Sequence, residues 1–189
     1  MPARSVSDLD KKNLALIRAN IISFMQKCAL IAGGAPAKLL DIAPQDHDGA
    51  KPFFSNNIQI ETFDIDPTAG CSYVGDICRT NNLIPDEHFD YIVCTEVLEH
   101  VRQPFDAVRE IWRLLKPGGL VFVSTPFNFR IHGPLPDCWR FTEHGLRELF
   151  SKFEIQSLEA LECDDRFLMP IQYTLVAEKP KAPAPKCPL

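Results

Sequence analysis

Hydrophobic residues recur along this chain in two patterns, one helical and one typical of buried strands. From residue 7 to about residue 32, apolar side chains recur at helical spacing, and Ser7 with Asp10 forms a capping box. Short apolar runs bounded by turn-forming residues follow, and each predicts a strand. They lie at residues 37–43, 58–63, 72–76, 89–94 and 120–124, with a closing pair near 154–161 and 167–178.

Two further segments between these strands have helical character. Residues 103–115 place several apolar side chains on one predicted face, and Thr142 is a plausible N-cap for a helix that ends at Phe150. The apolar face consists of Phe105, Val108, Ile111, Trp112 and Leu115. Strands that alternate with helices predict an α/β fold with a mostly parallel sheet, covered on both faces and closed by an antiparallel terminal hairpin.

Composition indicates a globular chain with one domain. The 189 residues suffice for one hydrophobic core, which we place at residues 1–179, and the proline-rich segment 180–189 is predicted to be a disordered tail. The net charge of −5 argues against broad attraction to nucleic acid. Seven scattered cysteines contain no Cys-x-x-Cys pair, and no membrane-spanning run or export signal is recognised. A cytoplasmic location is expected.

Polar residues stand where the predicted strands end. Asp41, Asp64 and Asp76 follow the first three strands, while Thr95 and Glu96 follow the fourth. Ligands of parallel sheets bind beyond the carboxyl ends of the strands, so these residues outline a candidate site. The alternative is that the aspartates merely cap the turns that follow each strand.

Two motifs carry a resemblance to class I S-adenosylmethionine-dependent methyltransferases of the small-molecule, type 11-like group. The motifs are Phe89-Asp-Tyr-Ile-Val-Cys-Thr-Glu-Val-Leu-Glu-His100 and Leu114-Leu-Lys-Pro-Gly-Gly-Leu-Val-Phe-Val-Ser-Thr-Pro126. The segment from His132 to Thr142 also resembles the one after the fifth strand in many bacterial members. The resemblance implies a Rossmann-like seven-stranded sheet and S-adenosylmethionine as cofactor.

The resemblance assigns cofactor roles by position. Asp64, with Ile65 beside it, resembles the acidic position that accepts hydrogen bonds from both ribose hydroxyls, and Asp66 is the fallback. A carboxylate suits that task because its two oxygens can engage neighbouring hydroxyls. Asp76 and Ile77 resemble the pair at the adenine. The remaining residues that the resemblance places along the cofactor are Asp41, Thr95 and Glu96.

The loop after the first strand departs from the family pattern. Ala43, Gln45 and His47 stand where glycines would let the backbone approach the cofactor closely, and Pro44 lacks a backbone donor. Two explanations compete: a variant loop that contacts the cofactor through side chains such as Gln45, or a decayed pocket in a noncatalytic relative. We favour the variant, since the acidic positions remain.

The candidate catalytic group is His132, in the loop after the fifth strand. An imidazole is a suitable base near neutral pH, and Asp137 is placed to orient it or to contact substrate. Arg130 or Arg140 would bind an anionic substrate group, and the opening helix with residues 127–140 would form the acceptor site. The alternative is that His132 and Arg140 only make loop hydrogen bonds.

A divalent metal is a second hypothesis for the same region. Glu96, Glu99, His100 and His132 together offer carboxylates and imidazoles, and this set resembles the magnesium site of small-RNA 2′-O-methyltransferases. The same glutamate-histidine string also occurs in metal-free methyltransferases, so the leading interpretation includes no metal.

Two functions of different classes remain. The leading one is methyl transfer to a small molecule, because no Asn/Asp-Pro-Pro-aromatic signature of DNA base methylation follows the fourth strand. Neither a nucleic-acid nor a membrane partner is expected. The alternative is a noncatalytic, methyltransferase-like binding or scaffold protein, and the glycine-poor loop keeps this alternative open.

Overall fold

A seven-stranded sheet forms the centre of the protein. The computed structural model describes residues 6–44, 49–163 and 166–181. Neighbouring strands follow the order β3-β2-β1-β4-β5-β7-β6. The strands are β1 (Ala37–Ile42), β2 (Ile58–Asp64), β3 (Tyr73–Val74), β4 (Phe89–Thr95), β5 (Leu115–Pro126), β6 (Glu154–Leu161) and β7 (Gln172–Glu178), and the helices are α1 (Asp8–Ala32), α2 (Pro104–Leu114) and α3 (Glu143–Leu149).

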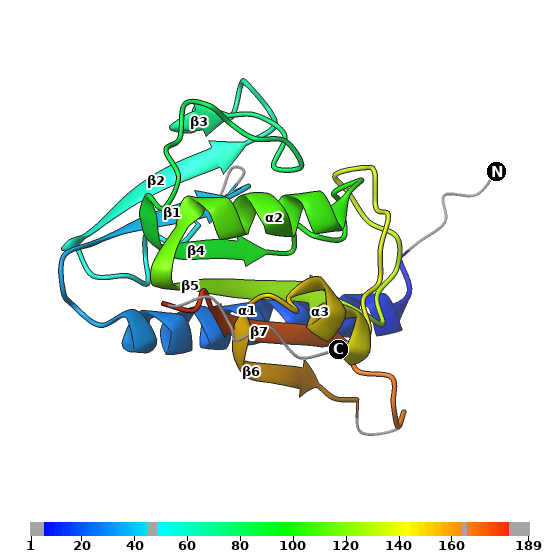
Figure 1. The fold of residues 1–189 in the computed structure, drawn as a ribbon. Helices are drawn as coiled ribbons and strands as arrows, with labels where there is room; N and C mark the ends of the chain where they lie inside the picture. Colours follow the sequence, from blue (N-terminus) through cyan, green and yellow to red (C-terminus); the bar gives the residue numbers. More distant parts are fainter. Residues whose placement is uncertain (1–5, 45–48, 164–165, 182–189) are drawn as a thin grey trace, which may run out of the picture.

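Strand direction confirms the predicted fold class. The first five strands pair in parallel, whereas β7 pairs antiparallel with both β5 and β6. Parallel strands joined through helices, with an antiparallel terminal pair, are the arrangement that the alternation of patterns predicted. Figure 1 shows the strands side by side from β3 to β6, with α2 and α3 in front of the sheet and α1 on its other face.

Alternate side chains along each strand enter two separate cores. On one face Leu40 and Val121 belong to a cluster with residues of α2 and α3. On the other face Leu39 and Phe122 pack with residues of α1, among them Met25. The period of two in a strand thus divides the apolar residues between the two helical layers.

The opening helix is the element that covers the second face. Its N-cap is Ser7, whose side chain accepts a hydrogen bond from the backbone N–H of Asp10, as the sequence predicted. By length and mean hydropathy alone, α1 would suffice to cross a membrane, so the expectation that no segment reaches that length is wrong. Phe24, Met25 and Cys28 are nevertheless buried against the sheet.

Some element bounds and side-chain positions differ from the prediction. β5 begins at Leu115, because the Lys-Pro-Gly-Gly segment continues as strand rather than as a turn. A Cβ at Gly119 would lie 2.9 Å from the Lys116 carbonyl oxygen and 3.0 Å from that of Asp90. Phe105, predicted on the buried face of α2, is 59% exposed.

Phe122 provides a test of the α1 core. Its side chain is fully buried and stacks on Tyr91 with ring centroids 6.0 Å apart. We expect Phe122→Ala to lower the free energy of unfolding by about 3–5 kcal/mol, because it leaves a cavity. Phe105→Ala on the exposed side of α2 should change it by less than about 0.5 kcal/mol. Urea unfolding measures both, and equal losses would contradict this packing.

Candidate active site

The carboxyl end of β1 is closed by a buried aspartate. Asp41 is 4% exposed, and its Oδ2 accepts a hydrogen bond from the Ala50 backbone N–H at 2.7 Å. Burial raises the pKa of the Asp41 carboxyl to about 6, against a smaller opposite effect of the Ala50 bond. Gly49 has a φ of 53°, and a Cβ there would lie 2.1 Å from Asp41 Oδ2. The loop therefore requires glycine at position 49.

The first residue after β1 has the backbone conformation that glycine favours. Ala43 has a φ of 55°, and its N–H donates to the Phe63 carbonyl at 2.7 Å. Such a conformation costs an alanine roughly 1–2 kcal/mol. Ala43 thus keeps the geometry of a glycine position although the residue has changed. Gln45 and His47 lie outside the described residues.

Three aspartates near the ends of β2 and β3 differ in burial and in their hydrogen bonds. Asp64 is 6% exposed, and its Oδ1 accepts the Asp66 N–H. Asp66 is exposed and caps its own turn, because its Oδ1 accepts hydrogen bonds from the N–H and hydroxyl of Thr68, which lower the pKa of Asp66. Asp76 likewise accepts the Cys78 N–H. The turn-capping alternative is thus correct for Asp66 and for one oxygen each of Asp64 and Asp76.

The two isoleucines that follow Asp64 and Asp76 in the sequence differ in solvent exposure. Ile65 is 69% exposed and stands free of the core, as a residue that contacts a ligand would. Ile77 is only 5% exposed and belongs to the core beneath α2. Its predicted packing on an adenine ring therefore requires an approach along the edge of the core.

Glu96, directly after β4, is held in a strained backbone conformation. Its φ is 54°, and its Oε1 accepts hydrogen bonds from Ser124 Oγ at 2.7 Å and from Gln172 Nε2 at 2.8 Å. Burial, followed by the nearby Glu99 carboxylate, raises the pKa of Glu96 to about 7. Thr95, its half-buried neighbour, ends the strand in register with Ser124.

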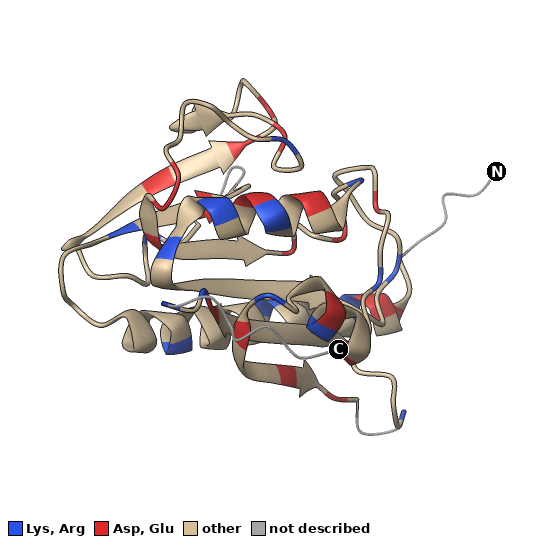
Figure 2. Ribbon diagram, in the orientation of Figure 1, with Lys and Arg blue, Asp and Glu red and all other residues tan. Residues whose placement is uncertain are grey.

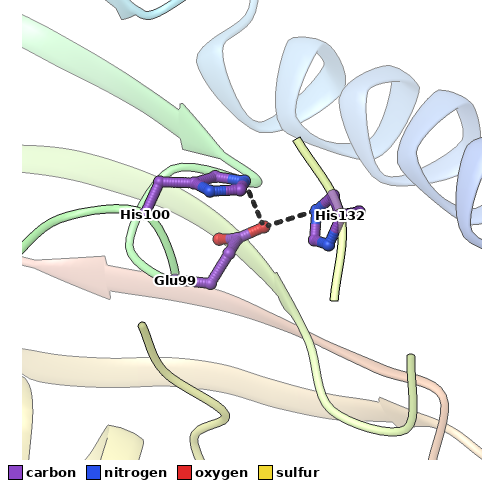
Figure 3. Close-up of side chains that lie close together, drawn as sticks. All are labelled: Glu99, His100 and His132. Atoms are coloured by element: carbon purple, nitrogen blue, oxygen red, sulfur yellow. Dashed lines mark ion pairs between the residues drawn. The ribbon is translucent and has the colours of Figure 1, made fainter. Parts of the chain in front are cut away.

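Glu99, His100 and His132 converge on one point (Figure 3). The Oε1 atom of Glu99 lies 3.7 Å from Nε2 of His100 and 3.7 Å from Nε2 of His132. The Glu99 side chain is fully buried, and neither of its oxygens accepts a hydrogen bond from the described residues. Glu96 does not belong to this cluster, so the predicted four-residue metal set is reduced to three.

The loop after β5 is fixed to the Glu99 turn by its backbone. The N–H groups of Cys138 and Trp139 both donate to the Glu99 carbonyl, at 2.7 and 3.1 Å. The indole N–H of Trp139 donates to the Val101 carbonyl at 2.8 Å. Two distant segments are thereby locked together, which places His132 opposite Glu99.

Asp137 and Arg140 support His132 from behind. Asp137 Oδ2 lies 3.1 Å from His132 Nδ1 and accepts the His132 backbone N–H at 2.9 Å. Arg140 binds both oxygens of Asp137 and holds the pKa of this carboxyl well below its usual range. Glu99, then Asp137, raise the pKa of His132. Because Arg140 is engaged with Asp137, its predicted role as a substrate anchor is not supported.

A cavity of about 650 Å³ adjoins these groups. Its apolar wall comes from α1, from Phe53 and from Phe129. Its polar wall consists of Arg18 from α1 and of Asp41, Thr95, Glu96, His100 and His132. The wall thus includes the predicted His132 and opening helix but not Asp64, Ile65, Asp76, Ile77 or Asp137. The sequence patterns did not identify Phe53, or the hydrogen bond from Gln172 to Glu96, as part of this site. The one sequence signal for Gln172 was its position as a lone glutamine beside the apolar residues of β7.

Comparison with known proteins gives a family match over most of the chain. A family model described as a methyltransferase domain matches residues 15–161. Among curated proteins, a ubiquinone biosynthesis O-methyltransferase of Pseudomonas putida (strain W619) is 54% identical over 39 residues, which are 21% of this chain and 17% of that protein. The match thus spans less than a fifth of the curated relative.

Solved structures share the fold at low sequence identity. The [4+2]-cyclase SpnF has a TM-score of 0.68 and 18% identity, over 86% of this chain and 81% of its own. The Burkholderia thailandensis 1,6-didemethyltoxoflavin-N1-methyltransferase, solved with 1,6-didemethyltoxoflavin and S-adenosylhomocysteine, has a TM-score of 0.61 and 16% identity, over 95% and 94%. NodS, an N-methyltransferase of Bradyrhizobium japonicum WM9, has a TM-score of 0.61 and 16% identity, over 87% and 97%.

The buried Asp41 predicts a pH-dependent stability. Its folded pKa of about 6 exceeds the ordinary value of 3.8, so the folded state binds more protons between these pH values. The Asp41 contribution to the free energy of unfolding should therefore fall as pH rises from about 4 to about 6, by at most about 3 kcal/mol. Asp41→Asn keeps an acceptor for the Ala50 N–H but cannot ionise.

Urea unfolding of wild type and Asp41→Asn at several pH values measures this contribution. The variant should gain stability relative to wild type as pH rises through this window. A difference that is constant with pH would show that Asp41 titrates normally.

Proposed function

Because the chain belongs to the methyltransferase family, we propose that it transfers a methyl group from S-adenosylmethionine to a small molecule bound in the 650 Å³ cavity. The observation that carries this proposal is the continuous polar edge from Asp41 to Glu96, which leads into a cavity that also contains an imidazole, His132. A methyl donor on that edge and an acceptor beneath α1 would meet there. The chemistry is an in-line displacement that depends mainly on alignment.

The cofactor would occupy the carboxyl ends of β1, β2 and β4. Asp64 keeps a second oxygen for the ribose hydroxyls, because only Oδ1 accepts a hydrogen bond within the described part of the chain. Ala43 retains the backbone form of the family glycine, which supports the variant loop over a decayed pocket. The B. thailandensis relative holds S-adenosylhomocysteine on the same fold, which further supports this cofactor.

The acceptor would be a small, partly apolar molecule with a hydroxyl group. Leu14, Ile17 and Phe53 give the cavity an apolar wall, and the curated relative named above is an O-methyltransferase. Basic and acidic residues alternate along α2 (Figure 2), and the net charge is −5, so nucleic acid is a poor candidate. A cytoplasmic location and the absence of a membrane partner belong to the same proposal.

His132 would receive the proton that the acceptor loses. It lines the cavity, and Asp137 fixes its ring through Nδ1, which leaves Nε2 toward the interior. This arrangement resembles the oriented bases of other transferases, in which a carboxylate selects the tautomer. Asp137 is accordingly a positioning residue for the ring rather than a contact of the substrate.

A noncatalytic binding or scaffold protein is the alternative function. The substitution of glycines in the loop after β1 favours it, and the cyclase SpnF illustrates that this fold also serves other chemistry. Calorimetry with S-adenosylmethionine and S-adenosylhomocysteine separates the two. Binding of either supports the enzyme, and the absence of heat and of a thermal shift at millimolar ligand would favour the scaffold.

Asp64 provides a specific test of the cofactor pose. We expect Asp64→Ala to weaken S-adenosylhomocysteine binding by about 1.5–3 kcal/mol, or roughly 10- to 150-fold, because the ribose hydroxyls lose a charged acceptor. Asp66→Ala is the matched control, since Asp66 caps only its own turn. Calorimetry measures both dissociation constants. A larger loss in the Asp66 variant would show that the ribose is bound one turn later.

His132 provides a separate test of the acceptor end. We expect His132→Gln to lower the rate of methyl transfer by about 100-fold or more, with cofactor affinity unchanged within about twofold. His144→Gln, an exposed histidine of α3, is the control. Single-turnover rates and calorimetry measure the two quantities. Parallel loss of cofactor affinity would mean that His132 supports the pocket only structurally.

A further inference from the structure

Within the described part of the chain, the Glu99 carboxylate is buried without a hydrogen bond, and its nearest charged neighbours are two imidazoles at ion-pair distance. Its side chain is 0% exposed, and both oxygens lack hydrogen bonds among the described residues. A buried carboxylate without a compensating proton donor or cation is strongly unfavourable. The backbone carbonyl of Glu99 accepts hydrogen bonds from the loop after β5, which fixes the backbone at this position. Positive charge at this point, from a protonated imidazole or from a cation between the three side chains, would compensate the carboxylate.

The two histidines present lone pairs to the same point. The Nδ1 of His100 lies 2.9 Å from the Pro136 carbonyl oxygen, which can only accept, so Nδ1 carries the proton. The Nδ1 of His132 lies 3.1 Å from Asp137 Oδ2 and must also be the donor. In the neutral tautomers, both Nε2 atoms therefore face Glu99 Oε1 with lone pairs.

We propose that Glu99, His100 and His132 bind a divalent transition-metal ion through Oε1 and the two Nε2 atoms. The three atoms lie within 4.8 Å of one another, and Oε1 is 3.7 Å from each nitrogen. Ligand atoms on a tetrahedral ion with bonds of about 2.1 Å lie about 3.4 Å apart, so the cluster needs only a small contraction.

The donor set selects the kind of ion. Two imidazole nitrogens and one carboxylate oxygen suit Zn²⁺, Mn²⁺ or Fe²⁺ better than Mg²⁺ or Ca²⁺, which prefer oxygen. Three protein ligands leave positions open, as in catalytic metal sites. His100 and His132 both line the 650 Å³ cavity, so an open position would face the acceptor.

The surrounding contacts are those that a metal site requires. Each ring has an outer Nδ1 hydrogen bond to a carbonyl oxygen, His100 to that of Pro136 and His132 to that of Arg130 at 3.3 Å. The Asp137 carboxylate lies 3.1 Å from the same His132 nitrogen. Arg140 in turn binds both oxygens of Asp137. Such outer contacts fix the tautomer and orientation of ligating histidines. The support of His132 thus serves a metal ligand as well as it serves a base.

We expect the ion to activate the acceptor. This role rests on the proposed methyl transfer, whereas the binding of the ion does not depend on that function. An acceptor hydroxyl bound to the ion would lose its proton to solvent, since the ion lowers its pKa. Its oxygen would then form a bond to the methyl carbon as the carbon–sulfur bond breaks, which yields the methyl ether and S-adenosylhomocysteine. In the metal-bound protein His132 would be a ligand, and this role replaces the base role that we propose above for the metal-free protein.

Titration of the untagged, metal-free full chain with Mn²⁺ or Zn²⁺ tests the site. We expect one ion per chain, and at least a 100-fold loss of affinity in both Glu99→Gln and His100→Gln. Asp137→Asn should lose about 10- to 100-fold. The exposed pair Glu148→Gln and His144→Gln should bind as wild type does. Calorimetry, with electron paramagnetic resonance for Mn²⁺, gives stoichiometry and affinity.

Two results would overturn the proposal. One is that wild type binds neither ion stoichiometrically at millimolar concentration, and the other is that Glu99→Gln and His100→Gln bind the ion with the affinity of wild type. Melting temperatures separate a loss of metal binding from misfolding of the variant. Mn²⁺ or Zn²⁺ should raise the melting temperature of wild type but not the melting temperature of folded Glu99→Gln. Chelation should abolish methyl transfer and leave S-adenosylhomocysteine binding unchanged. Chelator-insensitive transfer would overturn the role of the ion, whereas absent cofactor binding would instead refute the proposed function.

Discussion

The parallel pairing of β1, β4 and β5 is the constraint on which the rest of the structure depends. Because parallel strands end at the same edge, Asp41, Thr95 and Ser124 meet there although they are far apart in the sequence. The antiparallel return of β7 starts at this edge, where Gln172 pairs with Pro126. That register brings the Gln172 amide to Glu96, so the antiparallel part of the sheet also shapes the site.

The loop after β5 completes this edge. Its backbone donates to the Glu99 carbonyl, and Arg140 fixes Asp137 behind the His132 ring. Among the described residues, the buried side-chain oxygens without a hydrogen bond are both oxygens of Glu99, which faces two imidazoles, and Oγ1 of Thr125. A buried charge without a hydrogen bond is uncommon in a folded protein, which is why we propose Glu99 as a ligand of a metal ion.

Much of the fold could be predicted because its signals are local. The spacing of apolar residues in α1, the Ser7 cap and the acidic residues after strands follow from short-range rules that one sequence displays. The exposure of Phe105 could not be read this way, because the exact angle at which α2 meets the sheet decides it. The strand character of the Lys-Pro-Gly-Gly segment likewise depends on its pairing with β4.

The site was predictable in its members but not in its pairings. His132 and Asp137 are close in sequence and their contact was expected, whereas the approach of His132 to Glu99 depends on the path of a whole loop. The sequence also allowed Arg140 to face a substrate, and in the structure it donates two hydrogen bonds to Asp137. The path of a loop and the side-chain contacts it sets leave no periodic signal in a single chain.

The central claim is that the carboxyl edge of the sheet holds the methyl donor with its sulfur directed toward the cavity. A crystal structure of the protein with S-adenosylhomocysteine tests it most directly. We expect the ribose at Asp64, and the sulfur between Asp41 and the entrance near His132. Ligand density elsewhere on the molecule, or an edge without ligand at saturating concentration, would contradict it.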